Sequence, residues 1–352
     1  MDEEAIRSIF LRQTAACEKL GSPFTGRVCR LLAQRLDSAS KIGAIVFGWQ
    51  GNPDLGADSV PLRLCGALNN LVLIGADPGL AEVYPPKGGD SDDEKLWREI
   101  ARALDEHAGH IAEFLKSAPQ TNEVRRSAIL LAGWSWIATH FGRPLVVSEV
   151  GASAGLNLFA ERYLLKTDDF ERGRTGSPVV LPASWYGETP LQAEINVIER
   201  AGCDLAPIDP SDKAQRDRLI SYIWPDQRDR VERTEAAIAM AGKEGTPVEQ
   251  ADAADWLERR LARKFEGAVH VVQHTITWQY FPESVKAWGE VLLEEAGARA
   301  TPERPLARLS FEADGQNYGA AVGLTLWPGE RSLSLGRADY HGRWVDWRNP
   351  VV

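Results

Sequence analysis

The stretch LVVSEVGASAGLN, at residues 145–157, constrains the fold more than any other part of this chain. Its β-branched residues predict a strand, and that strand carries an acid, Glu149. Three small residues at a spacing of two, Gly151, Ser153 and Gly155, then predict a tight turn. A strand followed by such a turn and a helix brings the backbone close to a negatively charged or adenosine-bearing ligand.

The regions on either side of this stretch differ in their pattern of apolar residues. Residues 1–140 repeat apolar residues at helical spacing, which predicts a helical N-terminal domain. Over 141–352, strand-like and helix-like segments alternate, which predicts an α/β domain with a doubly wound, Rossmann-like, mostly parallel sheet. An amphipathic segment at 156–166 predicts the first helix of that domain. A Gly-, Pro- and charge-rich segment near 167–190 predicts an insertion.

A C-terminal hairpin and a role for the helical domain complete the predicted architecture. Strand-like runs at 320–326 and 332–335, joined by a Trp-Pro-Gly-Glu segment, predict a C-terminal antiparallel hairpin. We expect the helical domain to form a cap over the strand ends and to set the choice of substrate.

Composition narrows the class of protein. A formal net charge of −10 argues against a protein held on nucleic acid by its overall field. The 4 cysteines are scattered without a C-x-x-C pair, so we expect neither disulfides nor a metal site, and a reducing cytoplasm fits. The acidic N-terminus does not resemble a signal peptide, and no apolar run reaches the ~18–20 residues that span a bilayer. We therefore expect a cytoplasmic protein with a small-molecule substrate and no nucleic-acid or membrane partner.

Acidic and polar residues fall at the predicted ends of successive strands. In a doubly wound sheet, ligands bind beyond the carboxyl ends of the strands, where the strand order reverses. That rule selects Glu149 with its turn, Asp204, Asp252 and the segment 274–277. Asp204 is placed to accept hydrogen bonds from ribose hydroxyls, and Asp252 from the exocyclic amine of adenine. Helix N-capping is the competing explanation for both acids, since each precedes helix-like sequence.

The letters G-A-S-A-G also match the nucleophile elbow of serine hydrolases, with Ser153 as the nucleophile. The remaining members of the triad would be Asp314 or Asp339 with His341. Three observations disfavour this hypothesis: the region before the motif is helical, no HGGG-type segment precedes it, and Glu149 has no role in an elbow.

The arrangement as a whole resembles a class I S-adenosylmethionine-dependent methyltransferase. EVGASAG is similar to the glycine-rich first motif of that superfamily, with Ser153 in place of the middle glycine. GCDLAP resembles its acidic second-strand end, QADA its adenine-contacting turn, and the terminal hairpin its antiparallel strands six and seven. More narrowly, nearly the whole chain resembles an uncharacterised bacterial family, the domain of unknown function 2332. The matching segments are SEVGASAGLNLFAERY, AGCDLAPID, HTITWQYFP and WPGERSLSLGRADYHGRWVDW.

This resemblance implies a methyltransferase-type sheet and S-adenosylmethionine as cofactor, while the family itself brings no established reaction. The residues expected to bind the cofactor are Glu149, Gly151, Ala152, Ser153, Gly155, Asn157, Asp204, Leu205, Asp252 and Ala253. His274 and Tyr280 are the expected catalytic residues, with His274 as general base because its ordinary pKa lies near neutrality. Thr275 and Trp278 are expected to line the substrate pocket, where an aromatic face suits a sulfonium cation.

The leading hypothesis is therefore a methyltransferase that acts on a small molecule. The end of the fourth strand reads HTITW instead of the Asn/Asp-Pro-Pro-aromatic sequence of amino-methylating enzymes, which disfavours N-methylation of DNA bases or glutamine. A non-catalytic or regulatory protein that retains the fold is the alternative from another class, and a serine hydrolase that uses Ser153 is a further one.

Overall fold

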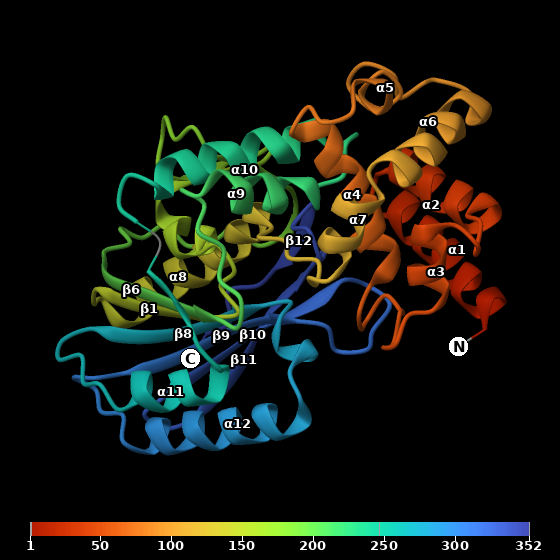
Figure 1. Ribbon diagram of the computed structural model, residues 1–352. Coiled ribbons are helices and arrows are strands. Elements are labelled where there is room, and N and C mark those ends of the chain that lie inside the picture. The colour runs from red at the N-terminus through yellow and green to blue at the C-terminus, as the bar shows by residue number, and fades with distance from the viewer. Residues whose placement is uncertain (1, 246, 352) are drawn as a thin grey trace. The chain divides into compact units, whose positions relative to one another are not determined.

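A nine-stranded sheet is the largest element of the computed structural model, which describes residues 2–245 and 247–351 (Figure 1). The strand order is β5-β12-β11-β10-β9-β8-β1-β6-β7. Five neighbouring strands run parallel, and these are β7 (Val248–Gln250), β6 (Val197–Asp204), β1 (Leu145–Val150), β8 (Val269–Thr275) and β9 (Leu306–Glu312). Chain order reverses between β1 and β8, so the predicted doubly wound α/β sheet is confirmed.

Antiparallel strands extend the sheet beyond β9. The predicted C-terminal hairpin is confirmed as β10 (Ala320–Trp327) and β11 (Arg331–Ala338). β12 (Trp344–Trp347) follows antiparallel to β11, and β5 (Ser184–Gly187), from the predicted insertion, pairs with β12 in parallel. A separate small sheet joins two strands of the insertion, β3 (Glu171–Gly173) and β4 (Val180–Pro182), to β2 (Leu164–Lys166), which precedes it.

The helix predicted over 156–166 is wrong. A 3-10 helix, η2 (Leu156–Arg162), occupies the first part of that segment, and β2 follows it. Residues 156–160 are all buried, and the backbone of Phe159 (φ −112°, ψ 21°) leaves the helical region and interrupts the helix. The Tyr163 hydroxyl donates a hydrogen bond to the Leu156 carbonyl at 2.6 Å, which turns the chain toward the small sheet.

Helices cover both faces of the large sheet (Figure 1). α8 (Ser127–Phe141) contacts β9 on one face, and it is apolar on nearly all sides. α11 (Ala253–Leu261) and α12 (Glu283–Ala298) cover the other face, where their apolar sides share a core with Val150 and Val272. Two short 3-10 turns, η1 (Val124–Arg126) and η3 (Trp278–Tyr280), precede α8 and α12.

The predicted helical N-terminal region forms a second unit with its own core. Its helices are α1 (Glu3–Lys19), α2 (Pro23–Arg35), α3 (Lys41–Phe47), α4 (Val60–Leu73), α5 (Pro78–Ala81), α6 (Asp93–Glu106), α7 (Ala108–Leu115) and α9 (Lys213–Ser221). α10 (Arg228–Ala241) begins in this unit and ends in the sheet unit. None of the helices in the described ranges is long and apolar enough to cross a bilayer.

The boundary between the units differs from the one expected near residue 140. The helical unit ends at Thr121 and takes back the segment Ser211–Glu232, so α8 belongs to the sheet unit. The returning segment joins the helical core through Tyr222, whose ring lies 5.4 Å from that of Phe114. Helical periodicity by itself does not tell which core a helix joins. The expected role of the helical unit as a cap stays a prediction.

Candidate functional site

The turn after β1 has an unusual backbone. Gly151, Ser153 and Gly155 have φ values of 69°, 54° and 70°, in the left-handed region. A non-glycine residue there costs about 1 kcal/mol or more, so Ser153 is strained. The turn also rests against β6, because a Cβ added to Gly202 would lie 2.7 Å from that of Ala152. Only a glycine at 202 permits this close approach.

Acceptor groups of the protein already bind several backbone N–H groups of this turn. The Ser153 N–H donates to a carboxylate oxygen of Asp204 at 2.9 Å, and the Leu156 N–H to the side-chain oxygen of Asn122 at 2.9 Å. The Ala152 N–H donates to a carbonyl at the end of β6. Since a seven-residue 3-10 helix follows the turn, there is also no α-helix N-terminus here to bind a phosphate.

Glu149 lies beneath the turn and is 2% exposed. It faces Gln273 of β8 in the register of the two strands, and Trp134 donates to the Gln273 side-chain oxygen at 2.8 Å. Burial raises the pKa of Glu149 to about 8, although Gln273 and Arg126 act in the opposite direction. One oxygen of this carboxyl group, Oε2, has no hydrogen-bond partner among the described residues. Glu149 is therefore a neutral, incompletely bonded acid at neutral pH.

The two acids expected at the neighbouring strand ends have different surroundings. Asp204 ends β6 and accepts from Ser153 in the turn and from the Ala206 N–H at 3.0 Å. No helix begins at that position, so the N-capping explanation is wrong for Asp204. Asp252 does cap a helix, since it accepts from the Ala254 N–H at 2.8 Å at the start of α11. Its proposed contact with adenine stays a prediction.

The other expected cofactor residues divide by exposure. Leu205 is 67% exposed, next to Asp204. Asn157 is buried and accepts from the Ser127 hydroxyl at 2.8 Å, and Ala253 is buried at the start of α11. The structure thus brings the turn, Glu149, Asn157 and Asp204 together, while Asp252 and Ala253 belong to the helix that follows β7.

His274 is 1% exposed, and both of its ring nitrogens are bonded. Nδ1 lies 2.8 Å from a carboxylate oxygen of Glu312, and Nε2 accepts from Arg308 at 3.1 Å. Because arginine only donates, Nε2 holds a lone pair, and Nδ1 carries the proton that Glu312 accepts. Burial lowers the pKa of His274, although Glu312 acts in the opposite direction. The ring offers a substrate no nitrogen in this arrangement, and its expected role as general base stays a prediction.

The segment after β8 bends sharply toward the turn after β1. Ile276 has a φ of 48°, which is rare for a β-branched residue. The next residue, Thr277, covers Gly151, since a Cβ added to that glycine would lie 2.1 Å from the threonine Oγ1. Trp278 is buried and stacks on His274 with ring centroids 4.8 Å apart, whereas Tyr280 is 58% exposed. Of the expected catalytic and pocket residues, Tyr280 is the one whose side chain faces solvent.

Glu312 organises this segment, and the sequence reasoning missed it. Its carboxylate accepts from the backbone N–H groups of Thr277 and Trp278 and from His274. Burial acts to raise the pKa of Glu312, but these hydrogen bonds outweigh burial and lower it. The signal was present, because Glu312 ends β9 and the strand-end rule applies to it as it does to Asp204.

The serine hydrolase hypothesis requires a base beside Ser153. The Ser153 hydroxyl is buried and has no hydrogen-bond partner in the described part of the chain. Asp314 pairs with Arg337 at 2.6 Å, and Asp339 with Arg343 at 2.8 Å, so arginines engage both acids expected for a triad. This geometry disfavours an activated serine.

Comparison with known proteins gives one match. The model of a family described as "Uncharacterized protein conserved in bacteria (DUF2332)" matches residues 7–347. No curated protein and no solved structure matches the chain. Since the match covers almost the entire sequence, the chain belongs to the family DUF2332.

Proposed function

We propose that the carboxyl ends of β1, β6 and β8 bind S-adenosylmethionine, and that the protein is a methyltransferase acting on a small molecule. One observation carries this proposal: Ser153 and Ile276, with left-handed backbones, follow the two strands at which the strand order reverses. Strained residues persist where the surrounding structure holds them in place, and they cluster at ligand sites. The reversal point is also where doubly wound sheets bind ligands.

The chemistry of the side chains favours this cofactor over a dinucleotide. The turn gives its N–H groups at Ala152, Ser153 and Leu156 to protein acceptors, so it is poorly suited to a diphosphate. The side chains that converge there are instead two carboxyl groups, Glu149 and Asp204. Oxygen acceptors suit the ribose hydroxyls and the cationic groups of S-adenosylmethionine.

The residues of this chain would act mainly by positioning. The cofactor supplies an activated methyl group, so the protein has to align the acceptor and exclude water. Asp204 is proposed to hold the ribose, and the neutral Glu149 to offer its incompletely bonded carboxyl group to the cofactor. Tyr280, which is exposed, remains the proposed catalytic residue toward the acceptor. His274 becomes a positioning residue, because it orients Trp278 by stacking.

Calorimetry with S-adenosylmethionine and S-adenosylhomocysteine tests the proposal on the full chain. We expect saturable binding of both, and no heat at millimolar ligand would refute the proposal. Asp204→Asn keeps an acceptor oxygen for the turn but removes the charge, and it should weaken binding about tenfold, as the loss of one charge-assisted hydrogen bond implies. Asp168→Asn, on an exposed turn of the same unit, is the matched control and should bind as the wild type does.

Two further measurements separate the alternatives. Formation of S-adenosylhomocysteine from the bound cofactor, in the presence of a mixture of small metabolites, is expected of an enzyme. Binding without any such turnover favours the regulatory alternative. Labelling of Ser153 by a fluorophosphonate probe would support the hydrolase instead, and we expect none because its hydroxyl has no base beside it.

A further inference from the structure

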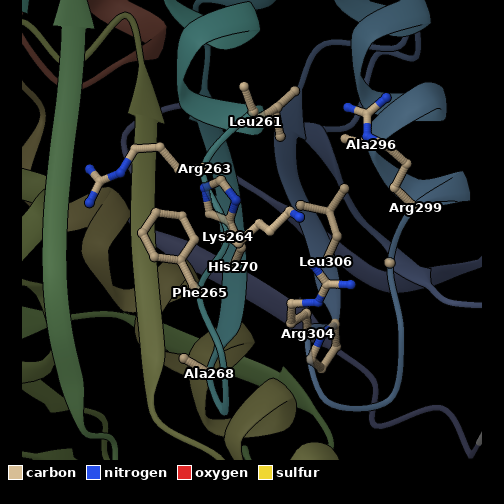
Figure 2. A pocket seen from close by; sticks show the side chains of 13 residues that line it. Leu261, Arg263, Lys264, Phe265, Ala268, His270, Ala296, Arg299, Arg304 and Leu306 are labelled. Atoms are coloured by element: carbon tan, nitrogen blue, oxygen red, sulfur yellow. The ribbon is translucent and has the colours of Figure 1, made fainter.

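A cavity of about 380 Å³ lies at the amino ends of β8 and β9, at the sheet edge opposite the proposed cofactor site (Figure 2). The loop that follows α11 forms one wall, and the loop that follows α12 forms the other. Leu261, Phe265 and Leu306 give the cavity an apolar lining. A concave space of this size, with apolar walls and a few polar groups, suits a small organic ligand.

The charged side chains of this cavity are all basic. Arg263, Lys264, Arg299 and Arg304 line it, and none of the described lining residues is acidic. This is a local excess in a chain with 50 acidic and 40 basic residues. Lys264 makes no ion pair with any of the described residues. The cavity therefore has a positive potential that the sequence as a whole does not predict.

Three of these side chains form ion pairs, with acidic residues that do not line the cavity. Arg263 pairs with Glu199 at 2.7 Å, but its side chain is 52% exposed. The Arg304 pair with Glu266 is 3.5 Å long, and the Arg299 pair with Glu295 is 3.9 Å long. The two long pairs are weak, so they leave Arg299 and Arg304 able to bind an anion. Arg263 is engaged more firmly, because Glu199 accepts from it twice, at 2.7 and 2.9 Å.

Helix ends explain only part of this basic cluster. α11 and α12 both end at the cavity, and a cation near a helix C-terminus stabilises the helix dipole. That effect accounts for Arg299, which caps α12. Lys264 lies two residues beyond the α11 cap, and Arg304 lies two residues before the start of β9. Figure 2 shows both side chains extending beside Leu306. Stabilisation of the helix ends does not require these two.

His270 adds a buried hydrogen-bond donor to the same cavity. The residue is 7% exposed and lines the cavity, and its ring packs against that of Phe265 in a T-shaped contact with centroids 4.9 Å apart. Its Nε2 lies 2.8 Å from the Ser148 hydroxyl, which also accepts from Arg260 at 2.8 Å. Burial lowers the pKa of His270 to about 3, so the ring is neutral.

The Ser148 hydroxyl fixes which nitrogen of His270 carries the proton. The Ser148 oxygen could accept from both Arg260 and Nε2, but its own buried hydrogen would then have no acceptor among the described residues, and Arg260 cannot accept it. The hydrogen therefore goes to Nε2 of His270, and the imidazole proton resides on Nδ1. Nδ1 has no hydrogen-bond partner among the described residues, and this atom is not completely shielded from solvent. An imidazole N–H is thus held rigidly with its donor unused at the wall of a basic cavity.

We propose that this cavity binds a small organic anion. Lys264, Arg304 and the Nδ1–H of His270 hold its phosphate or carboxylate group, and Phe265 and Leu306 contact its apolar body. Guanidinium groups match the planar or forked geometry of both anions, and the histidine adds a neutral donor that does not require a pH change. This binding site is independent of the proposed cofactor site, because the two lie at opposite edges of the sheet.

Phenyl phosphate, benzoate and inorganic phosphate are the probes for calorimetry on the full chain. We expect phenyl phosphate or benzoate to bind about tenfold tighter than inorganic phosphate, because only these two carry an apolar body. Which of the two binds tighter identifies the anionic group. Binding should weaken as salt is raised, since exposed charges supply part of the attraction. Absence of saturable binding by both aromatic anions would overturn the proposal.

Variants and a spectroscopic signal locate the binding. The double variant Lys264→Gln/Arg304→Gln should weaken binding of phenyl phosphate about tenfold or more. Lys243→Gln, an exposed lysine of the same unit outside the cavity, is the matched control. In ¹⁵N spectra of the imidazoles, the protonated Nδ1 of His270 should shift when phenyl phosphate is added. An unmoved His270 signal, or binding of a single-stranded oligonucleotide without binding of phenyl phosphate, would contradict the proposal.

Discussion

Replacement of Glu149 by glutamine should stabilise the protein above neutral pH. Glutamine has nearly the shape of a protonated glutamate but does not ionise. In the folded protein, burial raises the pKa of Glu149 from 4.5 to about 8. The folded state therefore retains a proton that the unfolded chain releases. Its stabilising effect is complete below the unfolded pKa and is lost as the pH rises through the folded pKa.

The size of the effect follows from the difference between the two pKa values. Each unit corresponds to about 1.4 kcal/mol, so the wild type should lose up to ~5 kcal/mol between pH 4.5 and 8. The loss between pH 6 and 8 should be ~2–3 kcal/mol. Glu149→Gln removes this pH dependence. The variant should thus be about as stable as the wild type in acid and more stable than it at pH 8.

Urea unfolding at pH 6, 7 and 8, followed by circular dichroism and tryptophan fluorescence, measures the effect without ligand. The informative quantity is the difference in free energy of unfolding between variant and wild type, which should grow with pH. Glu283→Gln is the control, since the Glu283 side chain is 89% exposed and should leave the pH profile unchanged. Parallel profiles for Glu149→Gln and the wild type would refute the reasoning, because they would mean that Glu149 is ionised in the fold.

Substitutions in three further places test the contacts of the sheet unit. Gly151→Ala should lower the free energy of unfolding in urea by ~2–4 kcal/mol, because of the left-handed φ and the overlap with Thr277. Adding Thr277→Ala should restore only the part due to the overlap, and full restoration would contradict the backbone argument. Ser148→Ala should cost ~1–3 kcal/mol in thermal unfolding, because it leaves buried polar atoms of Arg260 and His270 without their shared partner. Asp252→Ala should cost about 1 kcal/mol through loss of the α11 cap, and an unchanged affinity for S-adenosylmethionine would remove Asp252 from the cofactor site.

Local sequence was sufficient for much of the architecture. The alternation of strand-like and helix-like segments after residue 140 predicted a doubly wound sheet, and the sheet has that order from β7 to β9. The turn after β1 was also predictable, because the glycines at 151 and 155 permit the left-handed backbone found there, which Ser153 adopts under strain. The C-terminal hairpin was predicted from two strand-like runs and a short turn segment. Each of these depends on periodicity or turn chemistry within a few residues, which the sequence displays directly.

Tertiary structure decided what the polar residues of the site do. Sequence placed His274 at a strand end but not between Glu312 and Arg308, which lie 38 and 34 residues further along the chain. Those two partners bond both nitrogens of a ring that is 1% exposed. Likewise, the small residues predicted a turn but not its partners, and Asp204 and Asn122 accept from its N–H groups across long sequence separations.

The segment from β1 into the following turn separates what the sequence determines from what the fold decides. Residues 145–157 by themselves determined a strand that bears an acid and ends in a tight turn, since backbone preferences act locally. They did not determine that Glu149 is neutral, or that a 3-10 helix follows the turn. A pKa depends on the burial and charges contributed by other strands, and the helix type depends on which faces of the segment other elements cover. Only the folded chain brings those elements together.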